Sequence, residues 1–347
     1  MIPDHLFDAL ACGARFAVFY AWMSAGSLGK VPDEVDHIYA MTTRGIEELS
    51  RQWSPILAAS NIALRITGVF CHQTPKAHYK HPVHGQKSPE LGDILLVHEH
   101  KTNFSSSRSE TMRRAVLVQA KMVDHGVPKG GKVDQFQEYL YEHWPEFDLK
   151  GKGAGSTGFQ PGMRDFGQGV DAGRYGLIER SPHANPNFRH LVFPYCCGFP
   201  WTFSEPSKPV RSAGGEDAGA FIANMLFDTS WLRGRRAVLP ATPLALSTTT
   251  PNNHFDVTIE ELLKLTAAKT LRFKNKPYVA GERGNTALVC LQVSDSNIGL
   301  LPETGSQFTP SVSDGDAEPP DDHSESEFED GFSIILIETG QEREARR

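Results

Sequence analysis

Two apolar segments close together in the sequence restrict the fold of this chain more than any other feature. The first is Leu91–Val97 (LGDILLV) and the second is Ala115–Met122 (AVLVQAKM). Nearly continuous apolar runs of this length are typical of β-strands that are buried on both faces. Helices must then cover both faces, so the pair predicts an α/β fold with a mixed central sheet flanked by helices.

Apolar periodicity predicts the other elements. Segment 43–59 has one apolar stripe at helical spacing, with Thr43 in the N-cap position. The other predicted helices are 5–24, 133–144, 215–232 and 258–268, and the other predicted strands are 62–71, 286–293, 332–337 and short runs between 174 and 203.

One segment is strongly acidic. Residues 303–330 contain ten Asp and Glu residues and no Lys or Arg, so the formal net charge of −7 becomes +3 for the remainder. That balance permits a basic groove for nucleic acid but does not by itself indicate one. The segment lacks the apolar content needed to join a core, and an apolar run follows it, so we expect a disordered internal linker.

The chain divides on these grounds into five parts. They are an N-terminal amphipathic helix (1–30), a core (31–240), a helix and strand elaboration (241–302), the acidic disordered linker (303–330) and a C-terminal strand with a tail (331–347). No apolar run is long enough to span a membrane. Five cysteines without a CxxC pair suit a reducing compartment, so we expect a cytoplasmic protein.

Three polar side chains interrupt the two apolar strands. Asp93 lies in the first, while Gln119 and Lys121 lie two residues apart in the second and therefore face the same side. Burying such groups without partners is costly. If the strands pair as a hairpin, the three side chains meet and form a site for Mg²⁺ (or Mn²⁺) beside a lysine. Such a metal polarises a phosphate and activates water, and the lysine offsets developing charge.

The arrangement of Asp93 and the Gln119-x-Lys121 motif, on consecutive strands between two helices, resembles the PD-(D/E)xK or restriction endonuclease-like superfamily. It is similar in detail to the branch with Gln in place of the usual acid, as in Mrr-type nucleases. The resemblance covers about residues 43–150. It implies a restriction endonuclease-like core with a C-terminal elaboration, in which Asp93, Gln119 and Lys121 are catalytic and Asp93 and Gln119 bind the metal.

Further site residues are implied by the same resemblance. Family members often carry a glutamate on the first helix, which implies Glu47 or Glu48 as a metal ligand, with Glu47 favoured because it flanks the apolar stripe. They also often carry a polar residue on the helix after the motif, near the phosphate. Gln135 and Gln137 are the candidates for substrate binding.

The implied activity is metal-dependent endonucleolytic hydrolysis of DNA, as in a microbial restriction or antiphage-defence system. No DNA-reading motif is visible, so we expect targeting by a regulatory or targeting protein partner, or by self-association into a homo-oligomer. The alternative is a catalytically silent nuclease-fold module that binds nucleic acid or a partner protein, with Asp93 and Lys121 as a structural ion pair.

A cluster of histidines suggests a third alternative, a metal-dependent hydrolase of another kind. Imidazole is a good zinc ligand, but no HxxxH helix or cysteine partner accompanies these residues. Contacts to substrate phosphate and plain surface exposure are the other interpretations. The cluster consists of His72, His78, His81, His84, His98 and His100.

Overall fold

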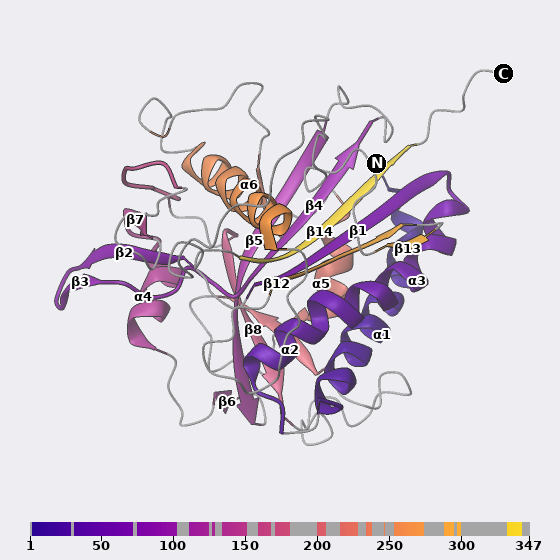
Figure 1. Cartoon of the computed structure of the whole chain (residues 1–347), viewed down its shortest axis with the longest axis horizontal. Coiled ribbons are helices and arrows are strands. Elements are labelled where there is room, and N and C mark those ends of the chain that lie inside the picture. Colours follow the sequence, from indigo (N-terminus) through magenta and orange to yellow (C-terminus); the bar gives the residue numbers. More distant parts are fainter. Residues whose placement is uncertain are drawn as a thin grey trace.

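A mixed β-sheet lies at the centre of the fold (Figure 1). The computed structural model describes residues 2–28, 31–71, 75–102, 111–124, 127–128, 134–150, 159–167, 171–180, 200–205, 216–227, 234–237, 246, 253–273, 288–294, 297–299 and 332–341. Within these ranges the strand order is β10-β9-β8-β5-β4-β14-β1-β12-β13, and β6 and β11 also pair with β5.

The strands of this sheet come from most of the chain. They are β1 (Ile62–Cys71), β4 (Ile94–Lys101), β5 (Thr111–Asp124), β6 (Val127–Pro128), β8 (Gly173–Glu179), β9 (Trp201–Ser204), β10 (Glu216–Asp217), β11 (Arg235–Arg236), β12 (Leu288–Ser294), β13 (Asn297–Gly299) and β14 (Ser333–Gln341). The β4–β14 and β5–β8 pairs are parallel, whereas β1 is antiparallel to both β12 and β14. The predicted mixed sheet is therefore confirmed.

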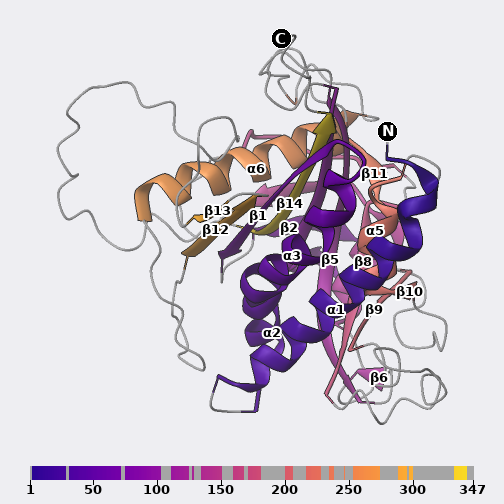
Figure 2. The same cartoon turned by 90° about the vertical axis from the view of Figure 1, so that its right-hand side faces the viewer.

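Helices cover both faces of the sheet, as predicted (Figure 2). One face packs on α1 (Phe7–Gly26), α2 (Glu34–Ala40), α3 (Ile46–Ala58) and α5 (Ala218–Asn224). The other packs on α4 (Gln135–His143), α6 (His254–Phe273) and a small sheet of β2 (Lys76–His81), β3 (Gly85–Lys87) and β7 (Phe147–Lys150). A hydrophobic core lies on each face of the sheet. Successive side chains of a strand alternate between these two cores, since Ile94 joins the first and Leu95 the second.

The strand nearest the C-terminus occupies a central position. β14 lies between β4 and β1 and pairs with both along most of its length. Its residues are buried as far as Gly340, and Ile335 and Ile337 enter one core while Ile334 and Leu336 enter the other. The predicted strand 332–337 is confirmed and is longer than expected. The acidic linker, 303–330, lies outside the described residues.

The helix predicted over 43–59 begins earlier than its apolar stripe indicated. Asp33 caps it, accepting hydrogen bonds from the N–H groups of Val35 and Asp36 at 3.1 Å. The helix then continues through a π-helical turn, Met41–Gly45, into α3. The prediction of Thr43 as N-cap is wrong, because Thr43 lies inside this turn and its hydroxyl donates to the Tyr39 carbonyl at 2.7 Å.

A glycine in β1 allows the π-helical turn to approach the sheet. A Cβ atom at Gly68 would lie 1.9 Å from the carbonyl oxygen of Thr42, well inside any tolerable contact. The helix and β1 can therefore pack this closely only with glycine at that position. This contact fixes where α2, and the residues it carries, lie relative to the sheet.

Helix α1 belongs to the core of the protein. The stretch Asp4–Gly26, which includes the 3₁₀ turn Asp4–Leu6, is long and apolar enough to cross a membrane by length and composition alone. However, Leu10 and Ala14 are fully buried against the sheet side of the fold, and the Trp53 indole N–H donates to the Leu10 carbonyl at 2.8 Å. These contacts are typical of a helix that packs in a protein core.

The remaining predicted elements are found with shifted ends. The strand 62–71 matches β1, and the predictions 133–144, 215–232, 258–268 and 286–293 correspond to α4, α5, α6 and β12. The predicted strand 91–97 corresponds to β4, which starts at Ile94 and continues to Lys101 through polar residues. The apolar run at 190–199 lies outside the described residues.

Candidate functional site

Asp93 lies in the turn that leads into β4 and is directed to β5 by backbone hydrogen bonds. β4 and β5 pair antiparallel, with Ile94 opposite Val118. The Asp93 N–H donates to the Val118 carbonyl at 2.8 Å, and Asp93 Oδ2 accepts from the Ala120 N–H at 2.7 Å. The predicted meeting of Asp93 with the Gln119-x-Lys121 motif therefore occurs, although Asp93 precedes the strand instead of lying within it.

Gln119 is fully buried and connects Asp93 to helix α4. Its Nε2 donates to Asp93 Oδ2, and its Oε1 accepts a hydrogen bond from Gln137 Nε2. Gln137 projects from the first turn of α4, after the N-cap Asp134. Gln137 thus joins the group, whereas Gln135, the other substrate-binding candidate, is exposed at the start of the same helix.

Lys121 contacts a residue that sequence reasoning missed. Its Nζ lies 3.4 Å from Oε1 of Glu34, the first residue of α2. Both side chains are partly exposed, at 23% for Lys121 and 27% for Glu34, so this end of the group is open to solvent. Glu34, and neither Glu47 nor Glu48, is the glutamate that lies beside the motif.

Glu47 and Glu48 do not reach this group. Both lie further along the helix, in the first turn of α3, and pair with arginines three residues away. Glu47 binds Arg44 at 3.0 Å, and Glu48 binds Arg51 at 2.5 Å. Pairs of this kind stabilise the surface of a helix. A sequence signal for Glu34 does exist in Asp33, which is an N-cap residue type followed three residues later by the acid Asp36.

Burial and crowding raise the pKa of the carboxyl groups here. The pKa of Asp93 lies well above its usual range, chiefly because burial disfavours its charged form and also because the Glu34 carboxylate repels it, while Lys121 acts in the opposite direction. Burial likewise raises the pKa of Glu34, with Lys121 opposing and Glu90 adding to the effect. Glu34 and Asp93 thus share one ammonium group, and a further cation would stabilise their ionised forms.

The donor set fits a divalent ion that prefers oxygen ligands. Among the described residues, no three His, Cys, Asp or Glu side chains converge closely enough to enclose a metal. Mg²⁺ does not need such enclosure, because it is usually held by one or two carboxylates and completes its shell with water and phosphate oxygens. Glu34, Asp93 and the Gln119 amide supply oxygen donors. In the structure the Gln119 oxygen accepts a hydrogen bond from Gln137, so Gln119 would have to rotate to offer this oxygen to a metal beside Asp93.

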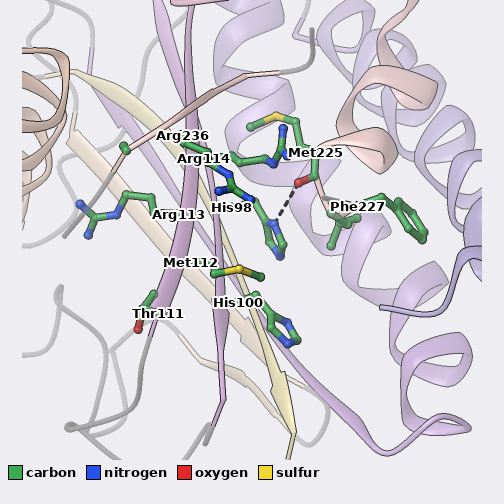
Figure 3. Close-up of a pocket in the computed structure, with 11 residues that line it drawn as sticks. His98, His100, Thr111, Met112, Arg113, Arg114, Met225, Phe227 and Arg236 are labelled. Carbon is green, nitrogen blue, oxygen red and sulfur yellow. Dashed lines mark hydrogen bonds between the residues drawn. The ribbon is translucent and has the colours of Figure 1, made fainter. Parts of the chain in front are cut away.

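A pocket of about 160 Å³ lies at the opposite end of β4 and β5 (Figure 3). His98 and His100 line it beside Arg114 and Met225. His98 Nδ1 donates to the Met225 carbonyl at 3.0 Å, so its Nε2 accepts from the Thr339 hydroxyl at 2.9 Å. Thr339 Oγ1 also lies 3.0 Å from His100 Nδ1. These bonds tie β4 to β14 and to the end of α5.

The histidines that suggested a zinc enzyme are thereby divided between two places. Both ring nitrogens of His98 are engaged by Met225 and Thr339, which leaves neither for a metal. His78, His81 and His84 lie on β2 and the β2–β3 hairpin, on the opposite face of the main sheet from the pocket. His72 lies outside the described residues.

Buried histidines predict that acid weakens the fold. Burial lowers the pKa of His98 to about 3 and of His37 and His100 to about 4. The unfolded chain protonates its histidines below about pH 6.5 while the folded chain does not, so their contribution to stability falls as the pH decreases from 6.5 toward 4. Each of these histidines should lower the free energy of unfolding by about 2 kcal/mol when the pH falls from neutral to about pH 5.

Urea unfolding of the parent and of His98→Gln at both pH values measures this effect. On acidification the unfolding free energy of the parent should fall by about 2 kcal/mol more than that of the variant, which is the contribution of His98. Each protein is compared with itself at the two pH values, so the cost of the substitution itself cancels. Parallel losses in the two proteins would contradict a neutral, buried His98.

The comparisons with protein-family models, with curated proteins and with solved structures found no significant match for this chain.

Proposed function

We propose that this protein is a nuclease that hydrolyses DNA phosphodiester bonds with Mg²⁺ or Mn²⁺. The observation that supports this most is the group at the start of the β4–β5 hairpin. There Asp93 is hydrogen-bonded to Gln119 and to the Ala120 N–H, and interacts electrostatically with Lys121, which pairs with Glu34 from α2. Oxygen donors for a divalent ion, beside one ammonium group and open to solvent, suit metal-dependent phosphodiester hydrolysis.

Each residue has a distinct part in the proposed reaction. Glu34, Asp93 and Gln119 would hold the metal, which when bound polarises the scissile phosphate and lowers the pKa of an attacking water. Asp93 is held in place by the Ala120 N–H, and Gln119 by Gln137. Lys121 would orient the water or offset the negative charge that develops on the phosphate oxygens. Gln137 therefore acts as a positioning residue behind Gln119.

A cleavage assay with purified protein tests the proposal. Supercoiled plasmid, linear duplex, single-stranded DNA and RNA are incubated with Mg²⁺ or Mn²⁺, with EDTA as control. We expect metal-dependent cleavage by the parent and a loss of at least roughly 100-fold in Asp93→Asn and Lys121→Ala. The double variant should be little worse than either single one, because these residues act as one unit. Full activity in a folded Lys121→Ala protein would refute the assignment.

A binding module without turnover is the second candidate function. The observation that favours it is the neutral Gln119, which provides no charge to a metal and whose Nε2 already donates to Asp93. Such a module would bind DNA in EDTA and show no metal-dependent cleavage of any of the four substrates. The same assay, with a binding measurement added, therefore separates the two functions.

A further inference from the structure

A basic hairpin arm projects beside helix α4 (Figure 1). The arm, residues 76–87, comprises β2, the turn after it and β3. It contains three lysines and three histidines and no Asp or Glu. Its tip is in solvent, where the side chain of Val83 is 78% exposed. A protruding segment with this composition attracts anions.

The inner face of the arm is fixed on α4. Ala77 and Tyr79 are buried, and the Tyr79 hydroxyl donates to the Phe136 carbonyl at 2.6 Å. Lys87 Nζ lies 4.2 Å from the centre of the Phe136 ring, a cation–π contact. The His81 ring lies 4.4 Å from that of Tyr139. Since these rings pack on one another, they hold the arm in position and are occupied in doing so.

The outer face of the arm carries two exposed lysines. Strand alternation places Lys76, His78 and Lys80 on this face, opposite to the buried Ala77 and Tyr79, and His78 Nε2 lies 3.0 Å from the Ser88 hydroxyl. Lys76 and Lys80 are exposed. Lys76 and Lys80 are four residues apart, about 13 Å along the strand, which is about twice the separation of successive phosphates along a nucleic-acid strand. The two lysines can therefore contact every second phosphate of one sugar–phosphate backbone.

The base of the arm is joined to the chain segment that leads to Asp93. The Ala77 N–H donates to the Pro89 carbonyl, and the Leu91 N–H donates to the Pro75 carbonyl, both at 2.9 Å. Gln137 Nε2 lies 3.4 Å from the Glu90 carbonyl and also contacts Gln119. The base of the arm, toward which a strand bound along the arm would run, therefore lies next to the segment that carries Asp93.

Acidic residues near the arm restrict the path that a polyanion can follow. Asp134, Glu138 and Glu142 recur every four residues on α4, so they share a face other than that of Phe136 and Tyr139. Asp148, opposite His78 on β7, lies 3.6 Å from Arg164. Glu90 lies at the base. A polyanion that approaches the arm is therefore attracted to the exposed lysines on the outer face of β2.

We propose that the outer face of this arm binds the sugar–phosphate backbone of a nucleic acid, independently of sequence, and directs it to the site of Asp93, Gln119 and Lys121. The part of this proposal in which the nucleic acid is guided to that site rests on the proposed nuclease function. The binding itself does not, because it requires only Lys76, Lys80 and the fixed geometry of the hairpin.

The test compares Lys76→Gln/Lys80→Gln with a control pair that removes the same charge elsewhere. Arg51 on α3 and Lys264 on α6 are 69% and 60% exposed, so Arg51→Gln/Lys264→Gln is the control. Binding of two labelled duplexes of unrelated sequence, and of one single strand, is measured by fluorescence anisotropy in EDTA. The salt concentration is varied between about 50 and 200 mM.

We expect the arm variant to bind both duplexes at least tenfold more weakly than the parent at the lowest salt. Its salt dependence should be shallower by up to about two units of log–log slope, whereas the control pair should behave as the parent. Equal affinity of the parent and arm variant would overturn the proposal, as would weakening of one duplex only. Binding that depends on the arm, without cleavage by the parent, would leave this inference standing and remove the nuclease function.

Discussion

A chain that ends after residue 331 should fail to fold. It would lack β14, which pairs with β4 on one side and β1 on the other. Phe332, Ile334, Ile335, Leu336 and Ile337 would leave the two cores together. Burial of each such side chain contributes about 1.5–3 kcal/mol, so the loss is comparable with the whole stability of an ordinary domain, about 5–15 kcal/mol.

Circular dichroism and thermal unfolding measure the consequence. The truncated protein should show no cooperative transition, and Ile335→Ala in the full chain should cost about 2–5 kcal/mol. The control replaces residues 306–330 with a Gly/Ser segment of equal length, which keeps β14 and should melt as the parent does. A cooperative transition in the truncated chain would show that β4 and β1 can pair without the strand between them.

Glu34→Gln should reduce cleavage by at least roughly 100-fold, while Glu47→Gln and Glu48→Gln should leave it within a few-fold of the parent. Glu34 lies beside Lys121 and interacts electrostatically with Asp93, whereas Glu47 and Glu48 bind Arg44 and Arg51. Glutamine has the shape of glutamate, so the change removes charge and little else. Initial rates on plasmid DNA in Mg²⁺ measure the effect.

The stability of Glu34→Gln provides a second, independent measurement. Because the pKa of Glu34 is raised, ionising it costs more in the folded than in the unfolded chain, and a neutral side chain should not lower the melting temperature. Lost activity with unchanged or higher stability is the expected combination. Activity that survives in Glu34→Gln but is lost in Glu47→Gln would return the ligand role to α3.

Local sequence patterns predicted the part of the candidate site that lies on adjacent strands. Gln119 and Lys121 share a face because side chains alternate along a strand, and Asp93 meets them because β4 and β5 form a hairpin. Each of these conclusions depends only on residues near one another in the chain. The same holds for α4, whose position directly after the motif brings Gln137 to Gln119.

The helix that contributes Glu34 could not be predicted in full from local sequence patterns. The apolar stripe of residues 46–57 predicted a helix that begins at Thr43, whereas the helix begins at Glu34. The first turns of the helix are positioned by the π-helical segment against Gly68, a contact between distant parts of the chain. Which glutamate reaches Lys121 depends on that contact, and no spacing within the helix reveals it.

The sequence by itself determined the α/β class, the strands β1, β4, β5 and β14, and the meeting of Asp93 with Gln119 and Lys121, because burial and strand alternation are local properties of a chain. Only the tertiary structure decided that β14 lies between β4 and β1, that β4 continues through His98–Lys101, and that Glu34 completes the group. Polar residues such as Glu99 and Lys101 can occupy a central strand because Arg113 and Glu338, from other strands, pair with them. Partners from distant parts of the chain become visible only when the sheet is assembled.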